Sequence, residues 1–243
     1  MKILSIQLGH NATVCLMENG EITMALSQEK IDNIKNSATF PRRAIEVVLN
    51  ERKLTSQDID EVVIAGTMIV PQHCLELQGT KSVSDHLNPP LNIRIGKRLE
   101  KGLFGMLLPG VFRFARARQH AKLRAEALDY LHERLRELDL ANKPLHFIDH
   151  HLCHARAAYH ALESEAGRGA LVFTLDGMGD GLCASVTRVG PSGEWQRIAE
   201  TPIRASLGSI YAETTRFLGM NPIEHEYKVM GLAPYGQPKY KDL

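Results

Sequence analysis

Short apolar runs separated by polar turns fill the first part of the chain. Runs of this length that are bounded by turn residues are typical of strands. We expect strands over residues 3–7, 12–17 and 21–26. The turn between the last two contains Asn19-Gly20, a strong signal for a tight hairpin. The N-terminal region is therefore predicted to form an antiparallel meander, whereas a Rossmann fold would pass from its first strand directly into a helix.

The pattern then changes from strand to helix and back to strand. Residues 28–39 are polar and are predicted to form a loop. Pro41 suits the first position of a helix, where its missing N–H is not needed. Residues 61–65 form a Val- and Ile-rich run that predicts a buried strand. The apolar face of the helix between them is made of Ala44, Ile45, Val48 and Leu49.

A second region repeats the combination of strands, a glycine-rich turn and helices. Strands are predicted over 145–148, up to Asp176, over 182–189 and over 194–200, and a helix over 206–218. Together with the order of three strands, a helix and a strand in the first region, this fits a duplicated plan. We predict an α/β protein with the actin/Hsp70/sugar-kinase-like ATPase fold, built from duplicated ββαβ-type halves.

Two glycine-rich turns, each between two strands, are candidate phosphate-binding elements. Gly9 and Asn11 lie in the first turn, and Gly177 and Gly179 lie in the second. Backbone N–H groups in such turns can point at an anion, although most turns of this kind only reverse the chain. We expect the two turns to face each other across a cleft and to hold the phosphates of a nucleotide.

Residues 68–140 separate the two regions and are expected to form a helical insertion. Lys and Arg dominate residues 94–124, which also contain an apolar run. We expect Pro109 and its neighbouring glycines to break a helix there, and a helix is predicted over 116–140. The role of the insertion is left open between a solvated helical hairpin, a basic lid over an anionic substrate and a contact to a partner.

Composition narrows the classes of function. The chain has 243 residues and a formal net charge of +1, so no general attraction to nucleic acid is expected. Its four cysteines are scattered without a Cys-x-x-Cys pair, which argues for a reducing compartment and against a zinc ribbon or disulfide scaffold. We see no secretory signal and no apolar run of about 20 residues, so we expect a cytoplasmic protein that makes no membrane contact.

The most informative candidate chemistry lies at the start of the helix predicted after residue 148. His150 and His154 are four positions apart, which places them on one helix face. Two imidazoles and a carboxylate such as Asp176 are the ligands of many catalytic Fe(II) or Zn(II) sites. The alternative is that both histidines are only surface or hydrogen-bonded residues. A zincin is excluded, because position 151 carries His instead of the Glu that acts there as general base.

The stretch 226–236 places one lysine, Lys228, among apolar and small residues, and it ends with Pro and Gly. It predicts either the end of a helix or a lysine directed at a phosphate. The residues by themselves favour neither interpretation.

Five segments, taken in their order along the chain, resemble the O-carbamoyltransferases, which include the nodulation-factor, cephamycin and tobramycin carbamoyltransferases. Each motif alone is moderately specific, whereas all five in the same order are highly specific. The segments are Gly9-His10-Asn11-Ala12, the stretch from Gln28-Glu29-Lys30 to Phe40-Pro41-Arg42, Asp149-His150-His151-Leu152-Cys153-His154-Ala155, Asp176-Gly177-Met178-Gly179-Asp180-Gly181, and Glu226-Tyr227-Lys228-Val229-Met230-Gly231-Leu232-Ala233-Pro234-Tyr235-Gly236.

The resemblance implies a reaction in two steps. A YrdC-like domain, which this sequence lacks, would join carbamoyl phosphate and ATP into carbamoyladenylate, and a role for Mg²⁺ is left open there. The ATPase-fold domain would then move the carbamoyl group to a hydroxyl of a small-molecule acceptor, namely a sugar, an antibiotic or another natural product. Fe(II) or another divalent metal in this domain would hold the adenylate phosphate.

The resemblance also assigns roles to single residues. His150 and His154 match the metal ligands of the family, with Asp176 as a third ligand. His10 matches the His of the family's His-Asp-x-Ser motif and would act at the acceptor hydroxyl as general base or orienter. We further assign Lys228, with the two glycine-rich turns, to phosphate or nucleotide binding, and Glu226 to the substrate.

The sequence departs from the family in residue type and in length. Asn11 replaces the usual Asp and Asn33 replaces a common Arg, which puts the family's way of holding substrate or phosphate in doubt at these positions. The second half is expected to be truncated soon after Gly236. We therefore predict a first half over 1–143 with the insertion, and an incomplete second half over 144–243. We expect the isolated chain to be inactive as a carbamoyltransferase.

Two alternatives stand beside this interpretation, and a third is disfavoured. The first is a tRNA threonylcarbamoyl transferase, but that family usually carries Glu inside its His pair, where this chain has His151, Leu152 and Cys153. The second is a non-catalytic ATPase-fold remnant that binds a partner chain carrying the missing half. A sugar kinase is disfavoured, because it needs no His pair. In the leading interpretation the protein does not bind nucleic acid, and whether it forms a homodimer is left open.

Overall fold

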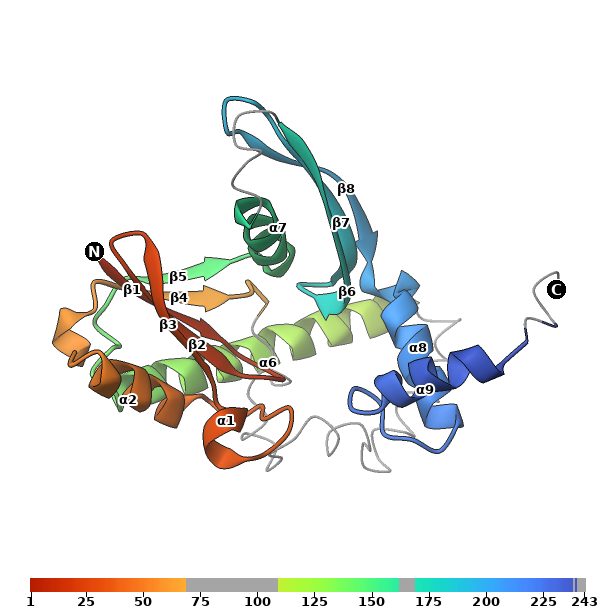
Figure 1. Ribbon diagram of the computed structural model, residues 1–243, viewed down its shortest axis with the longest axis horizontal. Coiled ribbons are helices and arrows are strands. Elements are labelled where there is room, and N and C mark those ends of the chain that lie inside the picture. Colours follow the sequence, from red (N-terminus) through yellow and green to blue (C-terminus); the bar gives the residue numbers. More distant parts are fainter. Residues whose placement is uncertain (69–108, 162–168, 238, 240–243) are drawn as a thin grey trace. The chain divides into compact units, whose positions relative to one another are not determined.

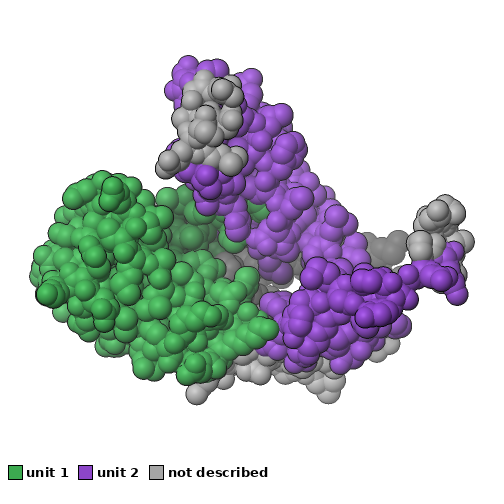
Figure 2. All heavy atoms as spheres, viewed as in Figure 1, with its two compact units in different colours: residues 1–153 green, residues 154–243 purple. Residues whose placement is uncertain are grey.

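The computed structural model describes residues 1–68, 109–161, 169–237 and 239. The chain divides into two compact units, residues 1–153 and 154–243, which Figure 2 shows in green and purple. Each unit has a sheet of its own, so the predicted α/β class is confirmed. The expectations for the first part of the insertion, residues 69–108, lie outside the described residues.

A five-stranded mixed sheet with the strand order β3-β2-β1-β4-β5 forms the centre of the first unit (Figure 1). β1, β2 and β3 pair antiparallel, while β4 runs parallel to β1 and β5 runs parallel to β4. The predicted meander is therefore confirmed, and its order of strands and helix is the one expected. The strands are β1 (Lys2–Gln7), β2 (Thr13–Glu18), β3 (Glu21–Ser27), β4 (Glu61–Ala65) and β5 (Leu145–Ile148).

The helices of the first unit differ from the expectation in three places. A short helix, α1, lies inside the stretch predicted to be a loop. Pro41 precedes α2 as its N-cap and is not its first residue. The expectation that Pro109 breaks a helix was wrong, because α6 begins at this residue, where a proline gives up no helical hydrogen bond. The helical elements are α1 (Glu29–Asp32), α2 (Arg42–Glu51), η1 (Ser56–Asp58) and α6 (Pro109–Arg136).

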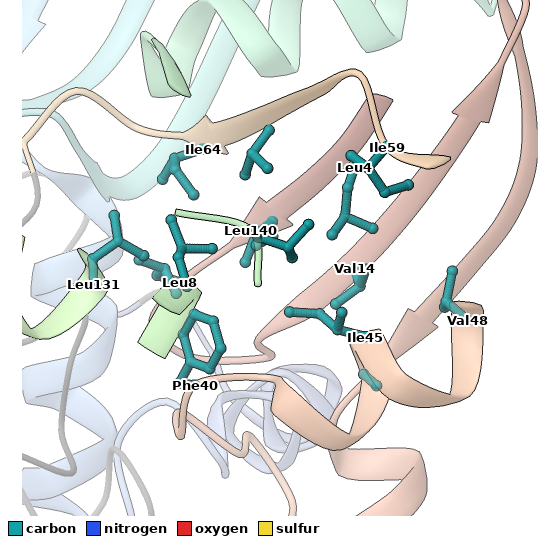
Figure 3. Close-up of a cluster of buried hydrophobic side chains, with 14 of the residues drawn as sticks. Leu4, Leu8, Val14, Phe40, Ile45, Val48, Ile59, Ile64, Leu131 and Leu140 are labelled. Carbon is teal, nitrogen blue, oxygen red and sulfur yellow. The ribbon is translucent and has the colours of Figure 1, made fainter. Parts of the chain in front are cut away.

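The main core of the first unit lies between this sheet and the helices α2 and α6 (Figure 3). Leu4 and Ile64 from the sheet are fully buried, as are Ile45 from α2 and Leu131 from α6. The C-terminal part of the presumed insertion thus belongs to the core of the first unit. Its contribution follows from apolar residues at helical spacing, namely Ala127, Tyr130, Leu131 and Leu135.

The division between the units falls within a helix, α7 (His150–His160). That the second half begins at residue 144 stays a prediction. In the contact-based division, β5 pairs with β4 in the first sheet and the second unit begins at His154.

The second unit contains a three-stranded antiparallel sheet in the order β6-β7-β8. Its buried cluster is small and consists of Ala155, Val172 and Val189, with Tyr159 and Trp195 packed against it. Trp195 also lies under the guanidinium of Arg156, 3.9 Å from the ring centroid. The elements are β6 (Ala170–Gly179), β7 (Leu182–Val189), β8 (Trp195–Pro202), η5 (Ile203–Ala205), α8 (Leu207–Phe217), α9 (Glu226–Leu232) and η6 (Ala233–Tyr235).

Within the described ranges, no helix combines the length and apolar character that crossing a membrane requires.

A core substitution tests whether α6 is integral to the first unit. Leu131→Ala is expected to destabilise the protein by about 2–5 kcal/mol, because it removes buried atoms and leaves a cavity. Ile22→Ala is the control, since this strand residue is 66% exposed and should change stability by no more than about 0.5 kcal/mol. Urea denaturation followed by circular dichroism measures both. Equal midpoints for the two variants would show that α6 is a dispensable appendage.

Candidate metal centre

Helix α7 positions two of the three candidate ligands. Its start is defined by Asp149, whose Oδ1 accepts a hydrogen bond from the backbone N–H of Leu152 at 2.8 Å, as an N-cap residue does. The carbonyl of Asp149 also accepts the bond from Cys153 N, at 2.9 Å. The capped start makes His150 the first residue of the helix and places His154 one turn later on the same face. The predicted helix start is confirmed, and the Asp149 cap is a feature that the sequence analysis missed.

Asp176 lies next to these histidines. His154 Nε2 is 3.4 Å from Asp176 Oδ2, and both residues belong to the second unit. His150 precedes His154 on the same continuous helix, and one ligand atom from each of the three residues lies within 4.8 Å of the others. The structure thus brings together the three residues that the sequence singled out.

The donor set fits a first-row divalent metal. Bonds of about 2.0–2.2 Å to imidazole nitrogen and carboxylate oxygen put neighbouring ligand atoms about 3.0–3.5 Å apart. The 3.4 Å between His154 and Asp176 matches this range, and the outer limit of 4.8 Å needs only small side-chain rotations. Three protein ligands leave coordination positions for other groups, as in catalytic rather than structural sites.

His151 belongs to a neighbouring face of α7. Its side chain is fully buried, whereas that of His154 is exposed. The rings of His151 and His150 meet edge-on, with 5.6 Å between their centroids. Ala155, four residues later, is buried as well. The helix therefore buries one face and presents the ligand pair on a neighbouring one.

The irregular end of β6, which forms the loop that carries Asp176, is held by Ser206 and Gly208, two residues that the sequence analysis overlooked. The strand β6 is irregular between Leu175 and Gly179, and Asp176 Oδ1 accepts a bond from Gly177 N at 2.6 Å. Ser206 Oγ donates to the carbonyl of Gly177 at 2.7 Å and accepts from Ser209 N at 3.1 Å, which makes Ser206 the N-cap of α8. The available signal was a Ser immediately before a helical apolar pattern.

Gly208 allows this close approach of α8 to the loop. A Cβ atom at position 208 would lie 2.9 Å from the Cα of Gly177, which is backbone that cannot move independently. The hairpin that follows turns at Asp180 and Gly181, both with positive φ, 49° and 82°, as the two central residues of a type I′ turn require.

The turn between β1 and β2, which contains His10, is tied to the polar segment after β3. Gly9 and Asn11 have φ values of 95° and 57°, which suit glycine and asparagine. Both backbone groups of Ala12 are used: its N–H donates to Ser37 O at 3.0 Å, and its carbonyl accepts from Gln28 N at 2.8 Å. This fixes the turn relative to the segment, while the His10 side chain itself is exposed.

Gln28 and Glu29 stabilise this polar segment. The buried Oε1 of Gln28 accepts from Ala44 N at 3.1 Å, close to the start of α2. Hydrogen bonds from Lys30 and from the backbone N–H of Asn36 lower the pKa of Glu29 below its ordinary value. Glu29 therefore stays charged at neutral pH and contributes stability that is lost only as the pH falls through its lowered pKa.

The stretch around Lys228 is helical, as one of the two interpretations required. Glu226 opens α9, and its Oε1 accepts from Ile223 N at 2.6 Å. Lys228 lies on the exposed side of this helix, with its Nζ 5.8 Å from the ring centroid of Tyr227. The binding roles assigned to Lys228 and Glu226 stay predictions.

Gly9 and Asn11 lie in a turn of the first unit, as expected. Gly177 and Gly179 were expected in a turn but belong to the irregular end of β6 in the second unit, and the turn itself is at Asp180 and Gly181. That the two glycine-rich stretches face each other and hold phosphates also stays a prediction.

Comparison with known proteins identifies the family of the chain. The model of the family "Carbamoyltransferase N-terminus" matches residues 2–243, and the chain belongs to this family. The chain is 30% identical over 236 residues to the nodulation protein NolNO of Sinorhizobium fredii (strain NBRC 101917 / NGR234), covering 96% of this chain and 29% of that protein. It is 41% identical over 97 residues to the nodulation protein NolO of Bradyrhizobium diazoefficiens, covering 40% of this chain and 17% of that protein.

The chain spans about a third of the length of the curated relatives that it matches almost throughout. Among solved structures, YeaZ from Pseudomonas aeruginosa aligns with 83% of this chain and 68% of its own length, at a TM-score of 0.37 and 10% identity. A similarity of this size carries no argument about function.

Removing either histidine tests the metal centre. His150→Ala and His154→Ala are each expected to lose most of the bound metal after anaerobic loading with Fe(II), because two remaining ligands hold a divalent ion poorly. His160→Ala, at the end of the same helix, is the control and should keep it. Mass spectrometry measures the metal content of each variant, and the absorption spectrum after loading with Co(II) is a second readout. Unchanged metal content in both ligand variants would rule the site out.

A glycine substitution tests the support of the Asp176 loop. Gly208→Ala should weaken metal binding and lower thermal stability, since its methyl group would press on Gly177. Gly231→Ala is the matched control in α9, where a Cβ meets nothing within 4 Å, and it should be neutral or stabilising by about 0.4–1 kcal/mol. Metal titration gives the affinity of each variant for metal, and thermal unfolding gives its stability. The role given to Gly208 fails if the two variants behave alike.

Proposed function

We propose that this chain performs the metal-dependent carbamoyl-transfer step of an O-carbamoyltransferase. The observation that carries the proposal is the group of His150, His154 and Asp176 in a chain of the carbamoyltransferase N-terminus family. The proposed donor is carbamoyladenylate. The proposed acceptor is a hydroxyl of a small molecule such as a sugar, an antibiotic or another natural product.

The donor set favours an anionic ligand. Two neutral imidazoles add no charge and one carboxylate adds a single negative charge, so a divalent ion held by these residues keeps a net positive charge. When bound, the metal, with Fe(II) as the first candidate, supplies a Lewis acid and an orienting centre for the adenylate phosphate. The backbone N–H groups of Gly9, Asn11 and Gly179, together with Lys228, are proposed to hold the same phosphate region. The fourth expected group, Gly177 N–H, already donates to Asp176 Oδ1.

His10 is proposed to take the proton of the acceptor. The acceptor oxygen forms a bond to the carbamoyl carbon, the bond from that carbon to the phosphate oxygen breaks, and AMP leaves with its electrons. The hydroxyl proton passes to an imidazole nitrogen of His10, which lies exposed at the turn between β1 and β2. Imidazole titrates near pH 6.5 and therefore accepts a proton readily at neutral pH.

The donor must be made elsewhere. We propose that a YrdC-like domain, in the part that the longer relatives carry in addition, joins carbamoyl phosphate and ATP. The isolated chain is accordingly expected to release no AMP from these two compounds. The intact mass of the polypeptide from its natural source decides whether that part belongs to the same chain or to a separate one.

Replacement of His10 tests the proposed step in the natural polypeptide, or in the assembly with which it purifies. His10→Ala is expected to slow carbamoyl transfer from carbamoyl phosphate and ATP to a panel of hydroxyl acceptors by about 10²–10⁴-fold, while metal content stays unchanged. His154→Ala should lose both metal and transfer.

His132→Ala is the control, because this exposed histidine lies on α6 and, among the residues that the structure describes, bonds to Leu128 O of the same helix at 2.8 Å. Its transfer rate should equal that of the unchanged protein. A His10→Ala enzyme that transfers at the same rate would refute the role of His10.

A further inference from the structure

The carbonyl groups of the turn that carries His10 are held by side chains from the two flanking strands. The side-chain amide of Gln7, the last residue of β1, donates to Leu8 O at 3.0 Å and to His10 O at 3.4 Å. Thr13 Oγ1, at the start of β2, donates to Asn11 O at 2.6 Å. Because both neighbours of the Gln7 amide are carbonyl oxygens, only its NH₂ end fits between them.

Gln7 and Thr13 reach the turn from the same face of the sheet. They are direct partners in the antiparallel pairing of β1 with β2, so their side chains point to one side. The adjacent residues Ile6 and Val14 are fully buried and point to the other side. Ser27 Oγ on β3 lies 3.0 Å from Thr13 Oγ1. A chain of polar contacts therefore connects the third strand with the turn.

The two bonds of Gln7 act on two particular peptide units. Leu8 O and Gly9 N–H belong to one planar peptide unit, and His10 O and Asn11 N–H belong to another. In a trans peptide the C=O and N–H groups point in opposite directions. By holding both carbonyl oxygens on its own side, one side-chain amide thus directs two N–H groups, those of Gly9 and Asn11, to the other side.

These two N–H groups are available for a ligand. Among the residues that the structure describes, neither Gly9 N–H nor Asn11 N–H has a hydrogen-bond acceptor. Gly9 is buried, and a buried backbone N–H without an acceptor is rare. Gly9 and Asn11 have positive φ, whereas φ of His10 between them is not positive. Residues that alternate in this way turn their N–H groups into a concave anion site.

We infer that Gln7 is a positioning residue for anion binding at this turn. Its amide keeps the carbonyl oxygens of Leu8 and His10 away from the anion, which they would repel, and so presents the N–H groups of Gly9 and Asn11. Without this amide each peptide unit is able to rotate and exchange the directions of its two groups, as type I and type II turns do. The inference rests on the proposed function, which makes this anion the phosphate of the donor.

NMR spectroscopy tests the orientation of the two N–H groups without any transfer activity. The natural polypeptide, or the assembly with which it purifies, is labelled with ¹⁵N-glycine and ¹⁵N-asparagine and titrated with inorganic phosphate. The amide signals of Gly9 and Asn11 should shift. Gln7→Met, a side chain of similar size without a donor, should weaken phosphate binding about tenfold or more, because hydrogen bonds to a charged group are the stronger class.

Gln7→Glu is the second variant and should behave in the same way, since a carboxylate keeps the shape of the side chain but has no N–H. Ser5→Ala is the matched control, because Ser5 lies two residues earlier on the same face of β1, and it should bind phosphate as the unchanged protein does. Thermal unfolding identifies a variant that does not fold, and the other variant then decides.

Kinetics separate positioning from a loss of structure. Gln7→Met should lower kcat for carbamoyl transfer about 10–10²-fold, as small misplacements of reacting groups do, with little change in the KM of the acceptor. If His10→Ala transfers at the normal rate, the proposed reaction is wrong, whereas the phosphate titration still judges the role of Gln7.

Three results would overturn the inference. The first is that the Gly9 and Asn11 signals of the unchanged protein do not respond to phosphate. The second is equal phosphate affinity in the unchanged protein and a folded Gln7 variant. The third is an equal loss of affinity in Ser5→Ala, which would show that any change on this face of the strand disturbs the turn.

Discussion

The helical register of α7 is the constraint on which the candidate site depends. Because Asp149 caps the helix, residues four apart share a face from its first turn onwards. His150 and His154 fall on one face, while the fully buried pair His151 and Ala155 falls on another. A start one residue later would leave His150 outside the helix and remove the metal pair. The cap therefore keeps both imidazoles within the regular part of the helix.

Asp176 completes the site through backbone contacts rather than through a tightly packed core. Its loop is held by Ser206, which bonds to Gly177 and caps α8 at the same time, and by the close approach of Gly208. The turn with His10 is organised in a similar way, since both backbone groups of Ala12 bond to the segment between Gln28 and Ser37. Both loops that carry candidate chemistry are thus fixed by hydrogen bonds from a neighbouring segment, which positions them without burying the reactive side chains.

The two units differ in how much apolar surface they bury. The first unit covers its sheet with α2 and α6 and has a continuous core from Leu4 to Leu140. The second unit buries a small cluster and exposes the Leu and Phe residues of β6 and α8. The first unit therefore buries most of the apolar residues of its sheet, whereas the second leaves those of β6 and α8 exposed.

Much of the architecture was determined by the sequence alone, because short apolar runs and helical spacing are local patterns. The strands of both sheets, the helices α2, α7 and α8 and the hairpin at Asn19-Gly20 were predicted from such patterns. The sequence also singled out the three candidate ligands, since the histidines share one helix and Asp176 follows an apolar run in a glycine-rich stretch. Tertiary structure decided what local patterns cannot contain. It placed β5 beside β4, turned Pro109 from an expected helix breaker into a helix start, and made the end of the presumed insertion part of the core. Only the folded chain shows that Ser206 and Gly208 support the Asp176 loop, because they lie about 30 residues away and reach it through contacts that no sequence spacing encodes.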